Sequence, residues 1–298
     1  MEKILELKNL KKSFSIDKKI KIKAVDDISF DLYKGEFIGI VGESGSGKST
    51  LGRLIMNIHT PSSGRIVYNN LEITNKKVYK ANKKEIVKSM QIIFQDSISS
   101  LNSRKTVFQI ISEALRINKE YENKESLKQR VLKLMNKVGL SEEDLYKYPS
   151  EFSGGQRQRI GIARALIMNP DFIVADEPIA SLDVSMQAQI INLFKSLKSE
   201  RNLTCVFIAH DLSMVKYISD RIAVMYKGKI VELADTKEIY ENPVHPYTKL
   251  LIGSRLIPDP KFKNLSLQSS YNEKMDGFNF KNSKFEEIKE GHWVYKSS

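Results

Sequence analysis

Gly42-Glu43-Ser44-Gly45-Ser46-Gly47-Lys48-Ser49 decides the fold of this 298-residue chain, because it matches the phosphate-loop pattern G-x-x-x-x-G-K-[ST]. A loop that wraps a polyphosphate needs glycines, whose backbone N–H groups can point at the anion without a Cβ clash. Lys48 would add a positive charge beside the β and γ phosphates, and Ser49 would offer its hydroxyl to Mg²⁺. The stretch therefore predicts a nucleoside triphosphate site.

The sequence on both sides supplies the strand and helix that a phosphate loop requires. Residues 37–41 form a continuous apolar run, typical of a buried strand. Ser49 and Thr50 open a predicted helix that runs to about Asn57 and directs its positive dipole end at the phosphates. A glycine- and serine-rich turn without a ligand is the alternative, and the strand–loop–helix context argues against it.

Length and composition are those of an ordinary globular protein. With 298 residues, 41% of them hydrophobic, the chain can build one large α/β domain with an inserted subdomain. Its most apolar runs, such as 172–175 and 206–209, have the length of strands, so no membrane span is expected. Residues 1–7 alternate charged and apolar side chains, unlike a signal peptide, which predicts a cytoplasmic protein.

The single cysteine and the excess of positive charge narrow the possible functions. Cys205 lies in a predicted buried strand, and one cysteine can form neither an intrachain disulfide nor a multi-thiolate metal site. The net charge of +12 raises the possibility of an anionic partner such as nucleic acid. The lysines are scattered, however, and the clusters at 18–23 and 75–80 fall in segments that we interpret as hairpin or loop. We therefore favour a solvated surface.

Hydrophobic periodicity divides the chain into β and helical regions. Apolar spacing changes from strand-like to helical after Gln95 and returns to strand-like after Pro170, which predicts an all-helical insertion between two β regions. The predicted elements are an antiparallel sheet within 3–41, strands at 64–68 and 90–94, helices at 107–117, 124–138 and 153–168, a strand at 172–175, a helix at 184–198, a strand at 203–209 and a hairpin at 222–233.

Three polar side chains follow the ends of two predicted parallel strands. Asp176 and Glu177 come directly after the strand at 172–175, at the carboxyl edge where open α/β sheets place their chemistry. Asp176 could hold Mg²⁺ directly or through water, while Glu177 could orient and polarise an attacking water. An acidic helix cap is the alternative for either residue alone. His210 follows the strand at 203–209 on the same edge, which favours contact with the γ-phosphate.

A second motif, Ser153-Gly154-Gly155-Gln156, opens the third helix of the insertion. Its serine and glutamine satisfy the capping-box pattern S-x-x-Q for a helix start. A helix N-terminus with a serine and two glycines also exposes several backbone N–H groups, so the segment can be both a cap and an anion receptor.

Together these motifs resemble the ATP-binding subunits of ABC transporters, over residues 3 to about 260. The resemblance implies a phosphate-loop NTPase fold of the ABC cassette type: an α/β domain with a mixed sheet core, an antiparallel β subdomain and a helical subdomain inserted at about 97–168. The matching motifs are Ser153 to Gln156 for the signature, Gln95 for the Q-loop, Asp176 and Glu177 for the Walker B pair, Ser181-Leu182-Asp183 for the D-loop, His210 for the switch histidine and Phe14 for the aromatic residue that stacks on adenine.

The same resemblance implies ATP and Mg²⁺ as cofactors. It implies catalytic roles for Glu177, His210 and Gln95, and a metal site formed by Ser49, Gln95 and Asp176. The residues that it implies in nucleotide binding are Gly42, Glu43, Ser44, Gly45, Ser46, Gly47, Lys48, Ser49, Thr50, Phe14, Ser153, Gly154, Gly155, Gln156 and Asp183.

Several partners are also implied by the resemblance. In the family the signature completes the ATP site of the opposite subunit, so we expect a head-to-tail dimer with a second ABC ATPase subunit, either a paralogue or a second copy. Two membrane permease subunits are expected to contact the surface near Gln95 and the helical insertion. An extracellular peptide-binding protein would take part indirectly, and this chain would lie peripherally on the cytoplasmic face of the membrane.

A narrower resemblance points to the ATPases of oligopeptide and dipeptide importers, most closely to the F-type subunits of oligopeptide permeases. It rests on residues 95–102, 182–189, 241–251 and 257–260, with 261–298 as a C-terminal extension of that type. Ser97 and 179–181 depart from the family pattern without changing the catalytic polar atoms. Some relatives bind an iron–sulfur cluster in this extension, and a chain whose only cysteine is Cys205 cannot.

The extension itself carries few structural signals. Residues 261–284 are polar and aromatic without periodicity, and we expect them to be disordered. Residues 291–295 could add a short strand. The 245–247 turn is expected to be a packing loop.

Two alternatives stay open at this stage. One keeps the transporter but replaces oligopeptides with nickel or another small solute, since the cargo is selected by other chains. The other is a soluble ABC ATPase that acts on nucleic acid, which the charge of +12 favours. Such proteins usually carry two cassettes or a long coiled coil, and this chain has neither, so nucleic acid is not expected as a partner.

Overall fold

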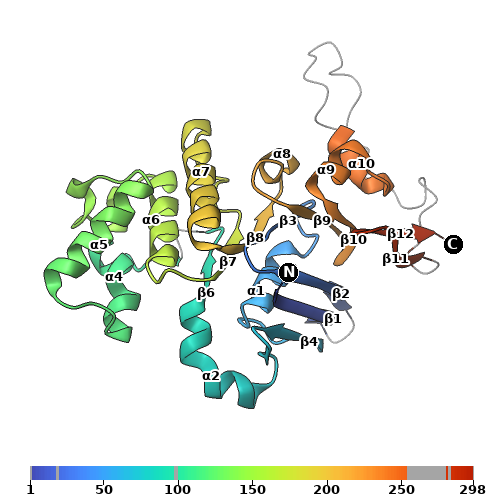
Figure 1. Cartoon of the computed structure of the whole chain (residues 1–298), viewed down its shortest axis with the longest axis horizontal. Helices are drawn as coiled ribbons and strands as arrows, with labels where there is room; N and C mark the ends of the chain where they lie inside the picture. The colour runs from blue at the N-terminus through green and yellow to red at the C-terminus, as the bar shows by residue number, and fades with distance from the viewer. Residues whose placement is uncertain (1, 18–19, 97–99, 254–279, 281–282, 298) are drawn as a thin grey trace, which may run out of the picture.

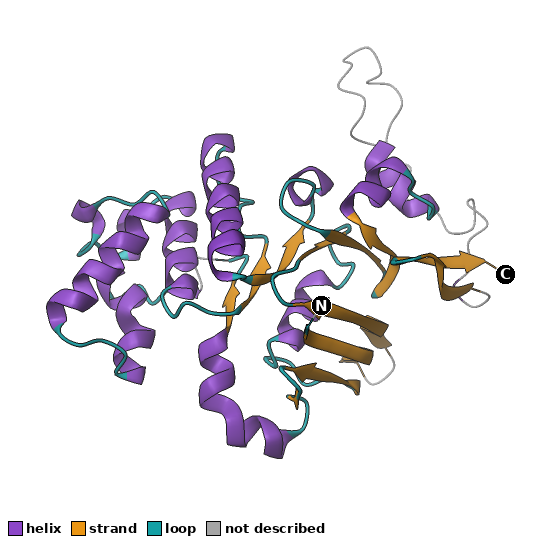
Figure 2. Ribbon diagram, in the orientation of Figure 1, coloured by secondary structure: helices purple, strands orange, loops and turns teal. Residues whose placement is uncertain are grey.

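The computed structural model describes residues 2–17, 20–96, 100–253, 280 and 283–297, which form two β-sheets with helices packed around them (Figures 1 and 2). Within these residues one sheet has four strands in the order β2 (Ile20–Tyr33), β1 (Lys3–Asp17), β4 (Ser63–Tyr68) and β5 (Leu71–Glu72). The other has eight strands in the order β11 (Ser283–Lys289), β12 (His292–Ser297), β10 (Lys229–Asp235), β9 (Arg221–Tyr226), β3 (Phe37–Val41), β8 (Thr204–Ala209), β7 (Phe172–Asp176) and β6 (Met90–Ile93).

The centre of the larger sheet is parallel. Strands β6, β7, β8, β3 and β9 pair in parallel, whereas β9 with β10, β10 with β12 and β12 with β11 pair antiparallel. Every residue of β3, β7 and β8 is buried, as expected for strands covered on both faces. This confirms the mixed sheet that the family resemblance implies. The parallel pairing gathers the carboxyl ends of β3, β6, β7 and β8 at one edge.

Helices cover both faces of this sheet and extend to one side of it. One apolar core joins the helical insertion to the sheet, and a second lies between the antiparallel sheet and the other face. The helical insertion lies at the left of Figure 1, and the C-terminal extension lies at the right. The helices are α1 (Lys48–Ile55), α2 (Lys76–Ser89), α4 (Val107–Asn118), α5 (Lys124–Lys137), α6 (Gly154–Leu166), α7 (Val184–Arg201), α8 (Leu212–Val215), α9 (Thr236–Glu241) and α10 (Pro246–Gly253), with 3-10 turns at Glu142–Asp144 and Pro149–Glu151.

The interpretation of residues 75–80 as hairpin or loop was wrong, because they begin helix α2. The backbone N–H groups of Lys77 and Val78 donate to Asn75 Oδ1, which caps the helix. Along α2 only Ile86 is buried, so the lysine-rich sequence shows no apolar stripe from which a helix could be predicted. Two predicted helices end earlier: α1 stops at Ile55 rather than Asn57, and α6 stops at Leu166 rather than Met168. The short helices α8, α9 and α10 were not predicted.

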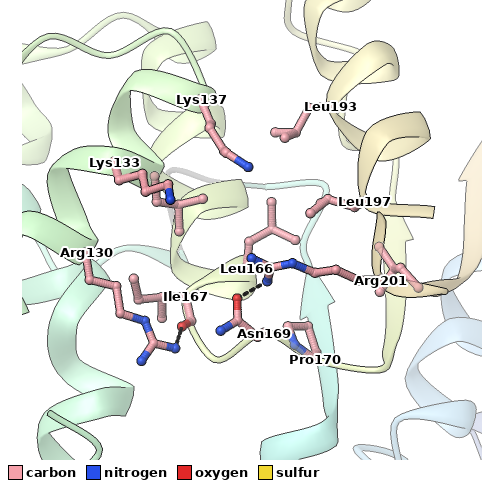
Figure 3. Close-up of a pocket in the computed structure, with 12 residues that line it drawn as sticks. Arg130, Lys133, Lys137, Leu166, Ile167, Asn169, Pro170, Leu193, Leu197 and Arg201 are labelled. Atoms are coloured by element: carbon pink, nitrogen blue, oxygen red, sulfur yellow. Dashed lines mark hydrogen bonds between the residues drawn. The ribbon is translucent and has the colours of Figure 1, made fainter. Parts of the chain in front are cut away.

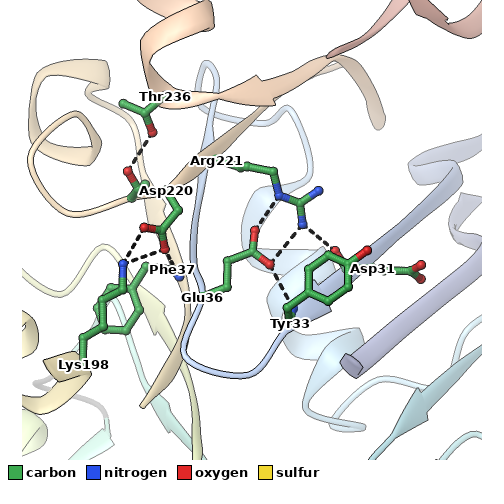
Figure 4. Close-up of polar contacts among 9 residues, drawn as sticks. Asp31, Tyr33, Glu36, Phe37, Lys198, Asp220, Arg221 and Thr236 are labelled. Atoms are coloured by element: carbon green, nitrogen blue, oxygen red, sulfur yellow. Dashed lines mark hydrogen bonds and ion pairs between the residues drawn. The ribbon is translucent and has the colours of Figure 1, made fainter. Parts of the chain in front are cut away.

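A polar cluster fixes the start of β3 and hence the strand that carries the phosphate loop (Figure 4). The Glu36 carboxylate accepts hydrogen bonds from Arg221 and from the backbone N–H of Tyr33. Asp220 accepts from the backbone N–H of Phe37 at 2.8 Å and from Lys198 Nζ. The cluster therefore ties β2, β3, β9 and α7 together at the edge of the sheet opposite to the loop.

The C-terminal extension adds strands to the main sheet. Strand β12 pairs with β10 through Glu232↔Val294 and Leu233↔Trp293, which confirms the strand predicted near 291–295. The disorder expected over 261–284 concerns residues that lie mostly outside the described part of the chain. In the part that the structure describes, no helix is both long and apolar enough to cross a membrane.

Candidate functional site

The phosphate loop follows β3 and ends where α1 begins. Three of its glycines have positive φ, at 153° for Gly42, 81° for Gly45 and 105° for Gly47. A Cβ on Gly42 would lie 2.1 Å from Met225 O, and one on Gly47 would lie 2.0 Å from Ala24 O. Only glycine fits these two positions, because the loop backbone packs directly against the backbones of β2 and β9.

Lys48, the first residue of α1, directs its side chain back to the start of the loop. Its side chain is buried, and its Nζ donates to Gly42 O at 2.7 Å and to Glu43 O at 2.9 Å. Burial lowers the pKa of this amine from its ordinary value. In the described part of the chain, Ser46 Oγ is buried in the same loop and has no hydrogen-bond partner. Both groups offer polar contacts to an anion held by the loop.

Two oxygen-bearing side chains meet next to the loop. Ser49 Oγ donates to Asp176 Oδ1 at 3.0 Å, although the two residues are 127 positions apart. Asp176 is buried at the end of β7, and this burial raises the pKa of its carboxyl. A hydroxyl and a carboxylate side by side are ligands of the type that a hard divalent cation takes.

Glu177 lies between the ends of β6 and β8. Gln95 Nε2 donates to Glu177 Oε2 at 2.9 Å, and His210 Nδ1 lies 3.6 Å from the same oxygen. The backbone of Glu177 is left-handed, with φ of 47°, a conformation that non-glycine residues seldom adopt. Three strand ends thus bring together the three side chains that the sequence predicted as catalytic.

Most of the predicted phosphate-binding residues line one cavity of about 350 Å³. Gln95 and Glu177 line it too, which joins the loop to the polar groups at the strand ends. The cavity wall also contains residues that sequence reasoning missed. Lys23 belongs to the basic cluster that we had interpreted as solvated surface. Its position in a hairpin just before β3 was the signal that could have placed it near the phosphate loop. The residues common to the prediction and the wall are Ser44, Gly45, Gly47, Lys48, Ser49, Thr50, Gln95 and Glu177, and the missed ones are Ile22, Lys23, Ala24 and Lys227.

Phe14, predicted to stack on adenine, does not line this cavity. Its side chain is 39% exposed, its ring meets His59 edge to face, and Lys12 Nζ lies 5.1 Å from the ring centre. Its cross-strand partner Ile22 does line the cavity. Phe14 therefore lies on the strand next to the cavity wall, directly opposite Ile22.

The signature segment forms the N-terminus of α6 with the predicted capping box. Gln156 N–H donates to Ser153 Oγ at 3.3 Å, and Ser153 N–H donates to Gln156 Oε1 at 2.9 Å. A Cβ on Gly155 would lie 3.3 Å from Ser181 O, so the signature touches the predicted D-loop. Asp183 caps α7 by accepting from Met186 N–H at 3.0 Å. None of these residues lines the phosphate-loop cavity of this chain.

The turn at 245–247, which precedes the C-terminal extension, reaches the phosphate loop through Tyr247. Its hydroxyl accepts a hydrogen bond from the backbone N–H of Glu43 at 2.9 Å, and its ring packs on Tyr226 with centroids 4.6 Å apart. The buried Glu232 carboxylate accepts from the backbone N–H of His245 at 3.0 Å and contacts His292 Nε2 at 2.8 Å. The 245–247 turn is thus more than a packing loop, because it joins β12 to the phosphate loop.

A phosphate loop, an acidic pair on the adjacent strand and a separate signature helix define an ATP-binding cassette protein. Residues 25–180 match the family model described as "ABC transporter", and residues 231–280 match "Oligopeptide/dipeptide transporter, C-terminal region". The chain belongs to the family of ATP-binding proteins of oligopeptide and dipeptide ABC transporters.

Curated relatives match it over nearly their whole length. The oligopeptide transport ATP-binding protein OppF of Bacillus subtilis (strain 168) is 52% identical, over 98% of this chain and 96% of the relative. OppF of Streptococcus pyogenes serotype M1 is 48% identical, over 99% and 95%. The dipeptide transport ATP-binding protein DppF of Lactococcus lactis subsp. cremoris is 45% identical, over 99% and 95%.

Solved structures support the fold. The ATP-binding cassette MJ0796, in a dimeric post-hydrolysis state bound to ADP and Pi, superimposes with a TM-score of 0.72 at 29% identity. The match covers 78% of this chain and 99% of that one. The cassette fold predicted from the motifs is therefore confirmed.

Proposed function

We propose that this chain binds ATP with Mg²⁺ and hydrolyses it to drive the import of oligopeptides. The observation that carries the proposal is that the phosphate loop, Gln95 and Glu177 line one cavity, with Asp176 bonded to Ser49 of its wall. We propose oligopeptides as the cargo because the relatives are named as oligopeptide and dipeptide transport proteins.

Each group has a role that follows from its position. The loop N–H groups and Lys48 would hold the β and γ phosphates, and Ser49, Asp176 and Gln95 would hold Mg²⁺. Bound Mg²⁺ supplies positive charge that offsets charge on the phosphate oxygens. Glu177 would orient and polarise the attacking water, with Gln95 fixing its carboxylate and His210 facing the γ-phosphate.

The separation of signature and phosphate loop supports a head-to-tail dimer. Because the signature lies outside the cavity wall, the backbone N–H groups of Gly154 and Gly155 in the first turn of α6 are available to an ATP bound by another subunit. That subunit would be a paralogue or a second copy. The matching cassette MJ0796 forms a dimer, which agrees with this arrangement.

The assembly would lie on the cytoplasmic face of the membrane. As an ATP-binding subunit of an ABC transporter, the chain needs membrane permease partners. We propose two of them, docked near Gln95 and the helical insertion, and an extracellular peptide-binding protein that delivers cargo. Gln158 Nε2 donates to Phe94 O, which connects α6 to the residue before Gln95 and supports transmission through this region. We also propose the division into a cassette at 1–260, with 97–168 as its helical subdomain, and an extension at 261–298.

Substitution of Glu177 by glutamine tests the catalytic assignment. In the assembled transporter, Glu177→Gln should lower steady-state ATP hydrolysis by about 100-fold or more, because the amide cannot polarise water as a carboxylate does. The dissociation constant for ATP should stay within about threefold of the wild-type value, since the substitution keeps the size of the side chain.

Glu200→Gln is the matched control, because Glu200 is an exposed carboxylate on α7 outside the site. It should hydrolyse ATP at the wild-type rate. Hydrolysis by Glu177→Gln near that rate would refute the role assigned to Glu177.

A further inference from the structure

A cleft of about 190 Å³ separates the helical insertion from α7 (Figure 3). Its walls come from α5, from the turn after α6 and from the last turns of α7. Asn169 and Pro170 precede β7, and Leu203 precedes β8, so the cleft lies at the amino ends of these strands. The phosphate loop lies at the carboxyl end of the sheet, and the two sites share no residue.

The floor of the cleft is apolar. Leu166, Leu193, Leu197 and Leu203 are buried members of the core that joins the insertion to the sheet, and half-buried Leu134 packs against them. This surface is rigid because it belongs to that core, and it favours an apolar occupant.

The rim of the cleft is positively charged. Arg130, Lys133, Lys137 and Arg201 surround the apolar floor, and among the described residues no aspartate or glutamate lines the cleft. Arg130 Nη2 donates to Ile167 O at 2.7 Å, and Arg201 Nη1 donates to Asn169 Oδ1. These acceptors are neutral, so they fix the two guanidinium groups without offsetting their charge.

The four rim cations differ from the surface lysines that are paired with a carboxylate. Many surface lysines of this protein are within 4 Å of a carboxylate, for example Lys3 with Asp31 and Lys88 with Glu120. Across the described residues, no carboxylate forms an ion pair with any of the four rim cations. An anion in the cleft would relieve their mutual repulsion.

We infer that this cleft binds a small amphiphilic anion, with a carboxylate or phosphate head held by the rim cations and a short apolar chain on the leucine floor. Guanidinium groups bind both head groups through paired N–H donors. The cavity volume limits the apolar part to a short chain. An occupant would contact both the helical insertion and α7.

Isothermal titration of the full chain with octanoate and octyl phosphate tests the inference. One of these probes should bind with one-to-one stoichiometry. Acetate, which has only the head group, and 1-octanol, which has only the chain, should each bind at least about tenfold more weakly, because each loses one of the two interactions.

Exposed lysines supply variants that leave the core intact. Lys133→Gln combined with Lys137→Gln should weaken binding of the better probe by about tenfold. The control combines Lys80→Gln with Lys195→Gln, two exposed lysines outside the cleft, and removes the same amount of charge. Its affinity should equal that of the wild type. Absence of binding by both probes, or equal weakening in the two double variants, would overturn the inference.

Discussion

At the scale of single residues, the most informative one is Glu177. A left-handed backbone at a non-glycine residue costs about 1–3 kcal/mol and persists only where the surroundings enforce it. Here Glu177 N–H donates to Ile208 O at 3.0 Å, and the side chain meets Gln95 and His210. Stored strain of this kind clusters at functional sites, so the backbone geometry supports the catalytic role proposed for this carboxylate.

A second residue-scale consequence concerns acid stability. Burial lowers the pKa of His245 from 6.5 to about 4. The unfolded chain therefore binds a proton between these values that the folded chain does not, and the free energy of unfolding falls as the pH falls through this window. From pH 7 to pH 5, protonation of His245 in the unfolded chain should lower the free energy of unfolding by about 2 kcal/mol.

Urea unfolding at both pH values measures this loss. His245→Asn, whose amide oxygen can replace the Nδ1 that accepts from Tyr247 N–H, should lose about 2 kcal/mol less than the wild type between pH 7 and pH 5. Identical pH dependence in the two proteins would contradict the assignment of His245 as a buried neutral group.

At the scale of elements, the strands and loops that depend on a local sequence pattern could be predicted, and those that depend on distant residues could not. The strands at the centre of the sheet were predictable because both faces are buried, and the phosphate loop because its glycines have no substitute. Helix α2 was not, because only Ile86 along it is buried. The bond between Tyr247 and Glu43 was not predictable either, since it joins positions 204 residues apart that only the folded sheet brings together.

That bond links helix α10 to the proposed ATP site through the backbone of Glu43. Tyr247→Phe removes only the hydroxyl that accepts from Glu43 N–H, which leaves this loop donor without its acceptor. We expect ATP affinity to fall by about two- to tenfold, the effect of one neutral hydrogen bond. Equilibrium titration with a fluorescent ATP analogue measures it.

Tyr240→Phe is the control for the loss of a tyrosine hydroxyl. Tyr240 donates to Leu212 O and lies outside the phosphate loop, so ATP affinity should be unchanged. If the two variants bound ATP equally well, Tyr247 would have no role in positioning the loop.

At the scale of the whole molecule, the proposed head-to-tail dimer assigns to this chain two halves of different ATP sites. Gly154→Asp tests this division, because a Cβ on Gly154 meets no atom within 4 Å and a carboxylate at a helix N-terminus is favourable. We expect a folded chain that binds ATP normally alone. In the assembled transporter, hydrolysis should fall by about tenfold or more, because the added charge repels the phosphates of the opposite site.

Gly253→Asp places the same charge at another glycine with open space and should hydrolyse ATP like the wild type. Unchanged hydrolysis in Gly154→Asp would show that the signature of this chain serves no ATP site.

Peptide uptake tests the central claim most directly. Cells from which the gene for this chain has been deleted would be given the wild-type chain, Glu177→Gln or Glu200→Gln, and uptake of a radiolabelled tripeptide would be measured at equal amounts of membrane-bound chain. The wild type and Glu200→Gln should restore uptake, and Glu177→Gln should leave it at the level of the deletion. Uptake by Glu177→Gln at the wild-type rate, or a deletion that takes up peptides normally, would contradict the account.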